Sequence, residues 1–333
     1  MEKSNLRSLF PFFGEQPTSG RAFRWCSMPA ILALAIAFVA IGLEASYAQV
    51  KDVAQKLGYP ADSKLLLIMG DDVGVSHAAD LASFTALNQG AITSGTVMAT
   101  SPWLTEIGQY AKQHPDISLG VHLVLSSEYN TYRWGPVAPK DQVPSLLDPD
   151  GYLWAHGSDT ISHAKLDDLE RELRAQIDRA LHFGIHPDFV DSHQRALMSN
   201  QQVFELYMKV AHDYNLPFLV GRDKATGGAF VSLLSDKDFA VDSVIVIPST
   251  TPSQDWMGFY TRAVKALKPG LYQLYVHLAF DGEEAEAISV DHTGYGAAWR
   301  QRDFSVMTSP EFKKALEENH VILVSWKDLK RIM

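Results

Sequence analysis

Residues 65–74 read LLLIMGDDVG, and this stretch decides the expected fold. Five apolar residues in a row are typical of a strand that is buried on both faces, as in the middle of a parallel sheet. The run leads directly into Asp71 and Asp72, and Ser76 is placed to cap a helix over residues 78–88. Two adjacent carboxylates at the end of a buried strand are costly without a partner, and a cation would supply one. The alternative interpretation is a turn with a helix-capping aspartate.

Strand-like segments and helical patterns alternate along the rest of the chain. Besides residues 64–69, strands are expected over residues 94–99, 118–125, 189–192, 218–220, 243–247, 272–278 and 321–326. The clearest helical pattern is residues 165–183, where apolar residues recur at steps of three and four: Leu166, Leu169, Leu173, Ile177 and Leu181. Further helices are expected over residues 103–113, 201–214, 255–267 and 310–319.

This alternation predicts a parallel α/β fold. The number of strands, about eight, favours a closed (β/α) barrel over an open sheet. The chain of 333 residues contains no internal repeat and no low-complexity linker, so we expect a single domain over residues 64–333, after a short lead-in of residues 49–63.

The N-terminal segment has the pattern of a secretory signal peptide. Arg21 and Arg24 precede the apolar run of residues 29–43, and small residues allow cleavage after Ala48. We therefore predict that residues 1–48 are a signal peptide and that the protein is exported, to the periplasm or outside the cell. The alternative is an uncleaved anchor, which would attach the exported domain to the membrane.

Composition excludes several classes of function. The chain carries 29 Lys and Arg against 39 Asp and Glu, a net charge of −10, and has no basic patch, so a nucleic-acid partner is not expected. Its single cysteine, Cys26, lies in the signal segment, so the exported domain has neither a disulfide nor thiol chemistry. No P-loop, dinucleotide-binding glycine motif or G-x-S-x-G elbow is present.

Three histidines share the setting of the acid pair. His122 in LGVHLVL, His193 in FVDSHQ and His277 in LYQLYVHLAF each lie in or at the end of an apolar strand. In a parallel barrel such positions converge on one mouth, so we expect these histidines near Asp71 and Asp72. Two imidazoles and one carboxylate suit a divalent metal such as zinc with an open coordination position, whereas magnesium prefers oxygen ligands.

Asp191 belongs to the same group of candidates. It precedes His193 by two residues, so both side chains lie on one face of a strand. Asp191 is expected to accept the free ring N–H of a ligating histidine or to bind the metal itself. The alternative is an ordinary acid at the end of a strand.

Several motifs, in order and spacing, resemble the YdjC-like carbohydrate deacetylases. They are GDDVG at residues 70–74, ITSGTVMATSPW at 92–103, LGVHLVL at 119–125, HPDFVDSHQ at 186–194, VHLAFDGEE at 276–284 and the closing residues 299–326. The resemblance covers roughly residues 64–326. It implies an irregular (β/α) barrel and the metal-dependent removal of acetyl groups from N-acetylated sugars.

The resemblance also implies roles for individual residues. Asp72, His122 and His193 would bind one divalent metal ion, zinc or magnesium, and Asp71 would be the catalytic base. His277 matches the late histidine of the family and is the expected acid that protonates the departing amine.

Residues of the long irregular segment 126–162 and one later arginine are candidates for binding the carbohydrate. Tyr132, Trp134 and Trp154 could stack on sugar rings, and Arg133 or Arg300 could bond hydroxyl groups; the alternative for the loop residues is packing of the loop onto the barrel. Two other functions fit the same pattern: a metal-dependent ester or phosphoester hydrolase, and an exported glycan-binding protein without turnover.

Overall fold

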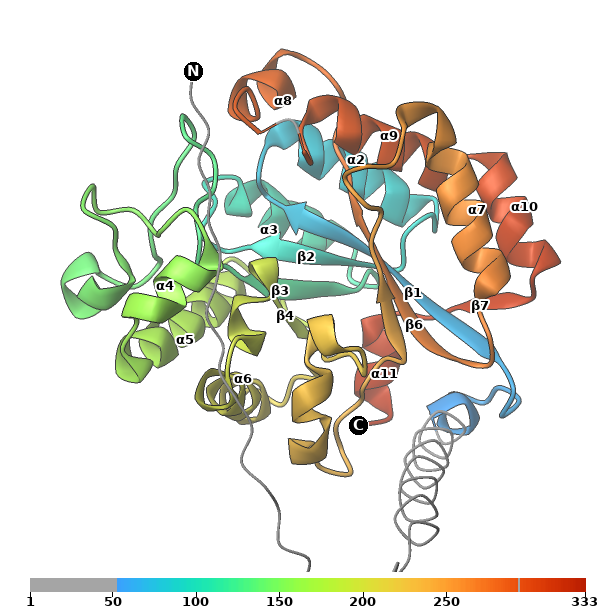
Figure 1. Ribbon diagram of the computed structural model, residues 1–333, viewed down its shortest axis with the longest axis horizontal. Coiled ribbons are helices and arrows are strands. Elements are labelled where there is room, and N and C mark those ends of the chain that lie inside the picture. Colours follow the sequence, from blue (N-terminus) through green and yellow to red (C-terminus); the bar gives the residue numbers. More distant parts are fainter. Residues whose placement is uncertain (1–52, 293) are drawn as a thin grey trace, which may run out of the picture. The chain divides into compact units, whose positions relative to one another are not determined.

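The computed structural model describes residues 53–292 and 294–333. The predicted signal peptide, residues 1–48, lies outside the described residues. The strands form one parallel sheet of the order β4-β3-β2-β1-β6-β5, with β7 also paired to β1 (Figure 1). Their bounds are β1 Lys64–Val73, β2 Ser94–Met98, β3 Leu119–Leu123, β4 Val190–Ser192, β5 Ser243–Ile245, β6 Gly270–His277 and β7 Val321–Leu323. The predicted parallel α/β fold is confirmed.

Strand β1 is the centre of this sheet. Along one edge it pairs with β6 from Lys64 to Asp71, while its other edge pairs first with β7 and then with β2. Every residue of β1 after Lys64 is buried. Since both edges and both faces of β1 are covered, its sequence is a nearly continuous apolar run rather than an alternating one.

Helices follow most of the strands and cover the sheet. Their bounds are α2 His77–Asn88, α3 Leu104–Gln113, α4 Gly157–His163, α5 Leu166–His182, α6 Gln201–Asp213, α7 Trp256–Ala266, α8 Glu283–Ile288, α9 Ala297–Met307, α10 Pro310–Glu318 and α11 Trp326–Arg331. The expected helices are confirmed to within two residues at their ends. Helices α4, α8, α9 and α11 were not predicted, and Trp326, placed in the last strand by the sequence, instead begins α11. Of the residues described, no helix is both long and apolar enough to cross a membrane.

The barrel is irregular, as the resemblance implied, and regular ladders do not close the ring of strands. The regular ladders end at β4 and β5. The expected strand over residues 218–220 forms only isolated bridges, Val190↔Phe218 on one side and Gly221↔Val241 on the other. This segment lies between Pro217, which lacks an N–H to donate, and Gly221, so it is too short for a regular ladder. Single bridges therefore connect β4 to this segment and this segment to Val241, which lies just before β5.

The alternation of side chains along β1 positions the site. Leu65, Leu67 and Met69 pack together in the interior of the barrel, while Leu66 and Ile68 pack against the layer that contains α7, α9 and α10 (Figure 1). Continuing this period of two places Asp71 on the interior face, at the carboxyl end of the strand. The barrel mouth at the carboxyl ends of the strands is thus where the acid pair lies.

Candidate metal centre and active site

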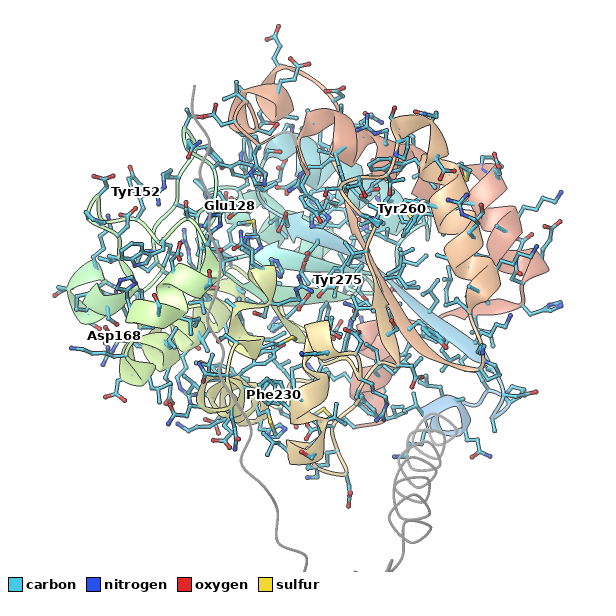
Figure 2. All side chains as sticks on the ribbon, viewed as in Figure 1. Glu128, Tyr152, Asp168, Phe230, Tyr260 and Tyr275 are labelled. Carbon is cyan, nitrogen blue, oxygen red and sulfur yellow. The ribbon has the colours of Figure 1, made fainter. Side chains whose placement is uncertain are left out.

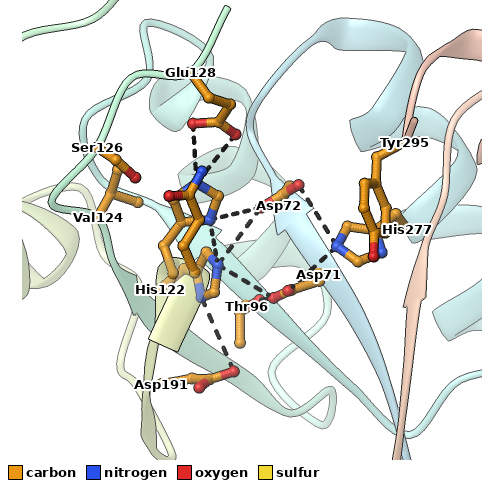
Figure 3. A network of polar contacts seen from close by, with 12 residues as sticks. Asp71, Asp72, Thr96, His122, Val124, Ser126, Glu128, Asp191, His277 and Tyr295 are labelled. Carbon is orange, nitrogen blue, oxygen red and sulfur yellow. Dashed lines mark hydrogen bonds and ion pairs between the residues drawn. The ribbon is translucent and has the colours of Figure 1, made fainter. Parts of the chain in front are cut away.

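The four strands that carry the predicted residues bring them together at one end of the barrel (Figure 3). Asp71 of β1 is paired in register with His277 of β6, and His122 of β3 is paired in register with Asp191 of β4. His193 follows β4 directly. Because all these strands are parallel, their carboxyl ends meet at the same mouth, where active sites of barrel enzymes lie.

Three of these residues turn one ligand atom each toward a common point. His122 Nε2 lies 3.5 Å from Asp72 Oδ1, His193 Nδ1 lies 3.4 Å from the same oxygen, and the two ring nitrogens are 3.0 Å apart. Ligands about 2.0–2.1 Å from a tetrahedral zinc ion would be about 3.3 Å from one another. Asp72 Oδ1 is buried and accepts no hydrogen bond. The spacing and the unused oxygen both fit a bound cation.

Two other groups of three ligands share members with this one. They are Asp71, Asp72 and His277, and Asp71, His122 and Asp191. Each of them offers two carboxylates and one imidazole, whereas the first group offers two imidazoles and one carboxylate. The first group therefore has the donor set most suited to zinc.

A left-handed backbone at Asp72 allows two adjacent acids to face the same site. In a continuous strand their side chains would point to opposite faces. Asp72 has φ = 57°, a conformation that aspartate tolerates better than most residues. The turn is held by Asp80 Oδ1, which accepts the Gly74 N–H at 2.6 Å. As a result one oxygen of Asp71 and one of Asp72 each lie 3.5 Å from His122 Nε2.

Glu128 orients His193. Both of its carboxylate oxygens lie 3.1 Å from His193 Nε2, which leaves Nδ1 to face Asp72. Burial alone would lower the pKa of His193, but Glu128 and Asp72 outweigh it and raise this pKa well above its usual range. Figure 2 places Glu128 near the carboxyl ends of the strands. Sequence reasoning missed this residue, because it lies in a loop without periodic pattern.

Arg300 of α9 forms a buried ion pair with Asp72. Its Nη2 donates to Asp72 Oδ2 at 2.7 Å and to the Tyr129 hydroxyl at 3.4 Å, and the side chain is only 4% exposed. Burial would raise the pKa of Asp72, but Arg300 and then His193 hold it well below its usual value. Asp72 is thus an ionised carboxylate with one oxygen paired and one oxygen available.

Asp71 and His277 form a second pair beside the ligand group. His277 Nε2 lies 3.5 Å from Asp71 Oδ2, and Thr96 Oγ1 donates to Asp71 Oδ1. Burial would raise the pKa of Asp71, but His122 and His277 together lower it below the usual value. The His277 backbone is fixed by Asp303, whose Oδ2 accepts the His277 N–H at 3.0 Å. An ionised acid and an imidazole therefore face each other where they could exchange a proton.

Asp191 lies beside one of the proposed ligand histidines, His122. Its Oδ2 is 4.0 Å from His122 Nδ1, longer than a hydrogen bond. Burial raises the pKa of Asp191 to about 6.

A cavity of about 560 Å³ opens over the acid pair. Arg300 lines this cavity, together with loop residues that sequence reasoning did not assign to the site: Glu128, Tyr129, His292 and Tyr295. The aromatic ring of Tyr295 lies 4.6 Å from that of His277. No periodic sequence pattern marks these positions as part of the site. For Tyr129, the abundance of aromatic residues in segment 126–162 was the one sequence feature that could have indicated it.

The four other residues expected to bind carbohydrate are not among those that line the cavity. Arg133 forms an ion pair with Asp148 at 2.8 Å, and Trp134 Nε1 donates to the Ser126 carbonyl at 2.7 Å. Trp154 stacks on His163 with ring centroids 4.2 Å apart, and Tyr132 contacts the rings of Tyr129 and Trp134. Their contacts with one another and with the loop match the alternative of loop packing.

Fold and site together define an irregular parallel α/β barrel with a candidate metal centre at the carboxyl ends of its strands. The family model described as YdjC-like protein matches residues 65–318. The chain belongs to this family, as the resemblance in its motifs indicated.

Relatives and a solved structure agree with this assignment. A carbohydrate deacetylase of Enterococcus faecalis is 27% identical over 80% of this chain and 98% of its own length. One of Thermus thermophilus is 27% identical over 85% of this chain and 99% of its own length. The crystal structure of a protein from Enterococcus faecalis V583 superimposes with a TM-score of 0.68, at 27% identity, over 80% of this chain and 99% of that one.

Proposed function

We propose that this protein is a metal-dependent hydrolase that removes N-acetyl groups from amino-sugar-containing oligo- or polysaccharides. The observation that carries the proposal is the convergence of Asp72 Oδ1, His122 Nε2 and His193 Nδ1, 3.0–3.5 Å from one another, beside a second acid that is not needed as a ligand. The chemistry of these donors fits one divalent ion, zinc in preference to magnesium. The carbohydrate substrate is supported by the relatives, which are carbohydrate deacetylases.

Each residue of the site has a role in this reaction. A divalent ion held by Asp72, His122 and His193 would supply a Lewis acid that polarises the acetamido carbonyl and acidifies water. Asp71 then accepts a proton from the attacking water, since its lowered pKa keeps it ionised. His277, 3.5 Å from Asp71, donates a proton to the departing sugar amine. Glu128 and Arg300 hold His193 and Asp72 in place throughout.

Export belongs to the same proposal. The segment 1–48 has the pattern of a signal peptide, so the enzyme would act in the periplasm or outside the cell. N-terminal sequencing of the native protein should begin near Gln49. Recovery of the full-length chain from the soluble cytoplasm would contradict export.

Acetate release from chito-oligosaccharides, measured together with the metal content of the purified protein, tests the function. We expect acetate release that stops when a chelator removes the metal and returns when zinc is added back. Parallel assays with a simple carboxylic ester and a phosphodiester distinguish the deacetylase from the alternative, an ester or phosphoester hydrolase. Turnover of those esters without any acetate from the oligosaccharides would contradict the deacetylase. Binding of the oligosaccharides without turnover of any substrate would favour a glycan-binding protein.

A further inference from the structure

We propose that Tyr275 is a positioning residue for His122 and that it acts through Asp191, across the interior of the barrel. This inference rests on the proposed metal site. Tyr275 lies two residues before His277 on β6. Asp191 of β4 lies two residues before His193, which follows the strand. Residues two apart on a strand share a face. On β6, Tyr275 therefore lies one layer below His277, while Asp191 of β4 is paired in register with His122.

A hydrogen bond across the barrel joins Tyr275 to Asp191. The Tyr275 hydroxyl donates to Asp191 Oδ2, and the other oxygen of Asp191 accepts the Ser192 N–H at 2.5 Å. Strands β4 and β6 are separated in the sheet by β3, β2 and β1, so this bond spans the interior and not a neighbouring pair of strands. Tyr275 also lines the cavity and lies among the strands in Figure 2.

The same oxygen, Asp191 Oδ2, faces His122 Nδ1, the ring nitrogen that does not point toward Asp72. The distance to His122 Nδ1 is 4.0 Å, and Nδ1 is buried without a hydrogen-bond partner. An imidazole that binds a metal through Nε2 carries its proton on Nδ1, and an acceptor for that proton fixes the ring and makes it a better ligand. At 4.0 Å the two atoms do not form a hydrogen bond in this structure, but Asp191 Oδ2 is an acceptor that faces Nδ1 and needs only a small shift to accept its proton.

The Tyr275 hydroxyl restrains the carboxylate in that position. Asp191 is 1% exposed, so water does not compete for its oxygens. With the Ser192 amide on Oδ1 and the Tyr275 hydroxyl on Oδ2, both oxygens are fixed, and Oδ2 remains directed toward His122. Removing the hydroxyl would free the carboxylate to rotate, and the orientation of His122 would no longer be set.

A purely structural role for Tyr275 makes a different prediction, and the chain offers a matched control for it. Tyr207 is fully buried, whereas Tyr275 is partly buried, and the Tyr207 hydroxyl donates at 2.9 Å to the carbonyl of Val190, the residue before Asp191. Tyr207 thus makes a hydrogen bond to the same strand but none to the Asp191 side chain. If Tyr275 only stabilises the barrel, Tyr275→Phe and Tyr207→Phe should behave alike.

Equilibrium competition for zinc between the full-length protein and a chromophoric chelator separates the two roles. We expect Tyr275→Phe to weaken zinc binding by about 10–100-fold, the usual effect of losing a group that orients a ligand. Tyr207→Phe should retain the zinc affinity of the parent, although both variants unfold at a lower temperature. A Tyr275→Phe protein that binds zinc as tightly as the parent would overturn the proposal. If Tyr275→Phe does not fold, Asp191→Asn tests the same hydrogen bond from its other end, and parent-like zinc affinity there overturns it equally.

The double variant tests whether Tyr275 acts through Asp191. Because the two residues form one chain of contacts, Asp191→Asn combined with Tyr275→Phe should bind zinc no more weakly than Asp191→Asn alone. Losses that add would contradict the path through Asp191. These measurements need no substrate. A parent protein that binds zinc but releases no acetate would therefore overturn the proposed reaction and leave the role of Tyr275 intact.

Discussion

The barrel mouth and the segment 126–162 with its supporting helix α5 each bury carboxylates, but the oxygens meet different partners. At the helix, Glu172 accepts the backbone N–H groups of Val137 and Ala138, at 2.9 and 2.8 Å. Asp168 accepts both the amide and the hydroxyl of Ser145. In the mouth, Asp72 Oδ1 accepts no hydrogen bond at all.

The difference distinguishes acids whose oxygens are satisfied by the fold from an acid that has an unused oxygen beside two ring nitrogens. Buried polar atoms are almost always hydrogen-bonded, so a satisfied carboxylate is fully explained by the fold. Glu172 and Asp168 attach the loop to α5 through these hydrogen bonds. The unused oxygen of Asp72, with ring nitrogens 3.4 and 3.5 Å away, would be satisfied by a cation bound as proposed. Mutations in the two regions should therefore change different properties.

The largest effect is expected from His122→Ala. This variant removes one imidazole of the ligand group, so metal and activity should be lost together and no acetate should be released above background. The free energy of unfolding of the metal-free protein should change by only about 1 kcal/mol. The exposed His182 at the end of α5 is the matched control, and His182→Ala should retain both. Full metal occupancy in His122→Ala, measured by elemental analysis, would show that His122 is not a ligand.

Replacing the two acids by their amides should separate their roles. Asp71→Asn keeps the shape of the side chain but cannot take up a proton, so kcat should fall by about 10²–10⁴-fold with metal affinity retained. Asp72→Asn loses a charged ligand, so metal affinity should fall as well, and excess metal should restore part of the activity. Titration of zinc into both variants while turnover is followed is the measurement. Rescue of Asp71→Asn by added metal would contradict its assignment as the base.

A smaller effect is expected from Glu128→Gln. The amide can no longer offer two acceptor oxygens to His193 Nε2, so zinc affinity should fall by about 10-fold, while the ligands themselves remain. Competition with a chelator measures this change. An unchanged affinity would mean that the orientation of His193 is fixed without Glu128.

Glu172→Gln should leave the site untouched. One of its two oxygens becomes an NH₂ group, which cannot accept an amide N–H, so the protein should lose about 1–3 kcal/mol of stability. Denaturant unfolding measures the loss, and zinc affinity should equal that of the parent. A fall in zinc affinity comparable to that of Glu128→Gln would remove the distinction between the two regions.

The strands and the strand-borne part of the site could be predicted from sequence, because local patterns determine them. The apolar run before Asp71 and Asp72 marks β1, and His122, His193 and His277 each lie within or at the end of an apolar segment. Parallel pairing then requires these positions to share one mouth.

The site residues and strand pairings that depend on residues distant in sequence could not be predicted. Glu128 and Tyr295 lie in loops, where no period of two or 3.6 residues marks which side chain faces inward. Arg300 was expected to bond hydroxyl groups, but its main partner, Asp72, lies 228 residues away. The segment 218–220 is apolar like a strand, yet its flanking proline and glycine leave it with isolated bridges. The roles of the loop aromatics in binding carbohydrate stay predictions.

Anomalous X-ray diffraction from crystals grown with zinc, recorded on both sides of the zinc absorption edge, tests the candidate metal centre most directly. We expect one strong anomalous peak in contact with Asp72 Oδ1, His122 Nε2 and His193 Nδ1, with Asp71 free of the ion. Two other ligand groups are close enough to compete, Asp71 with Asp72 and His277, and Asp71 with His122 and Asp191. A peak at either of those groups, or no peak in the barrel mouth, would contradict the assignment of ligands and base.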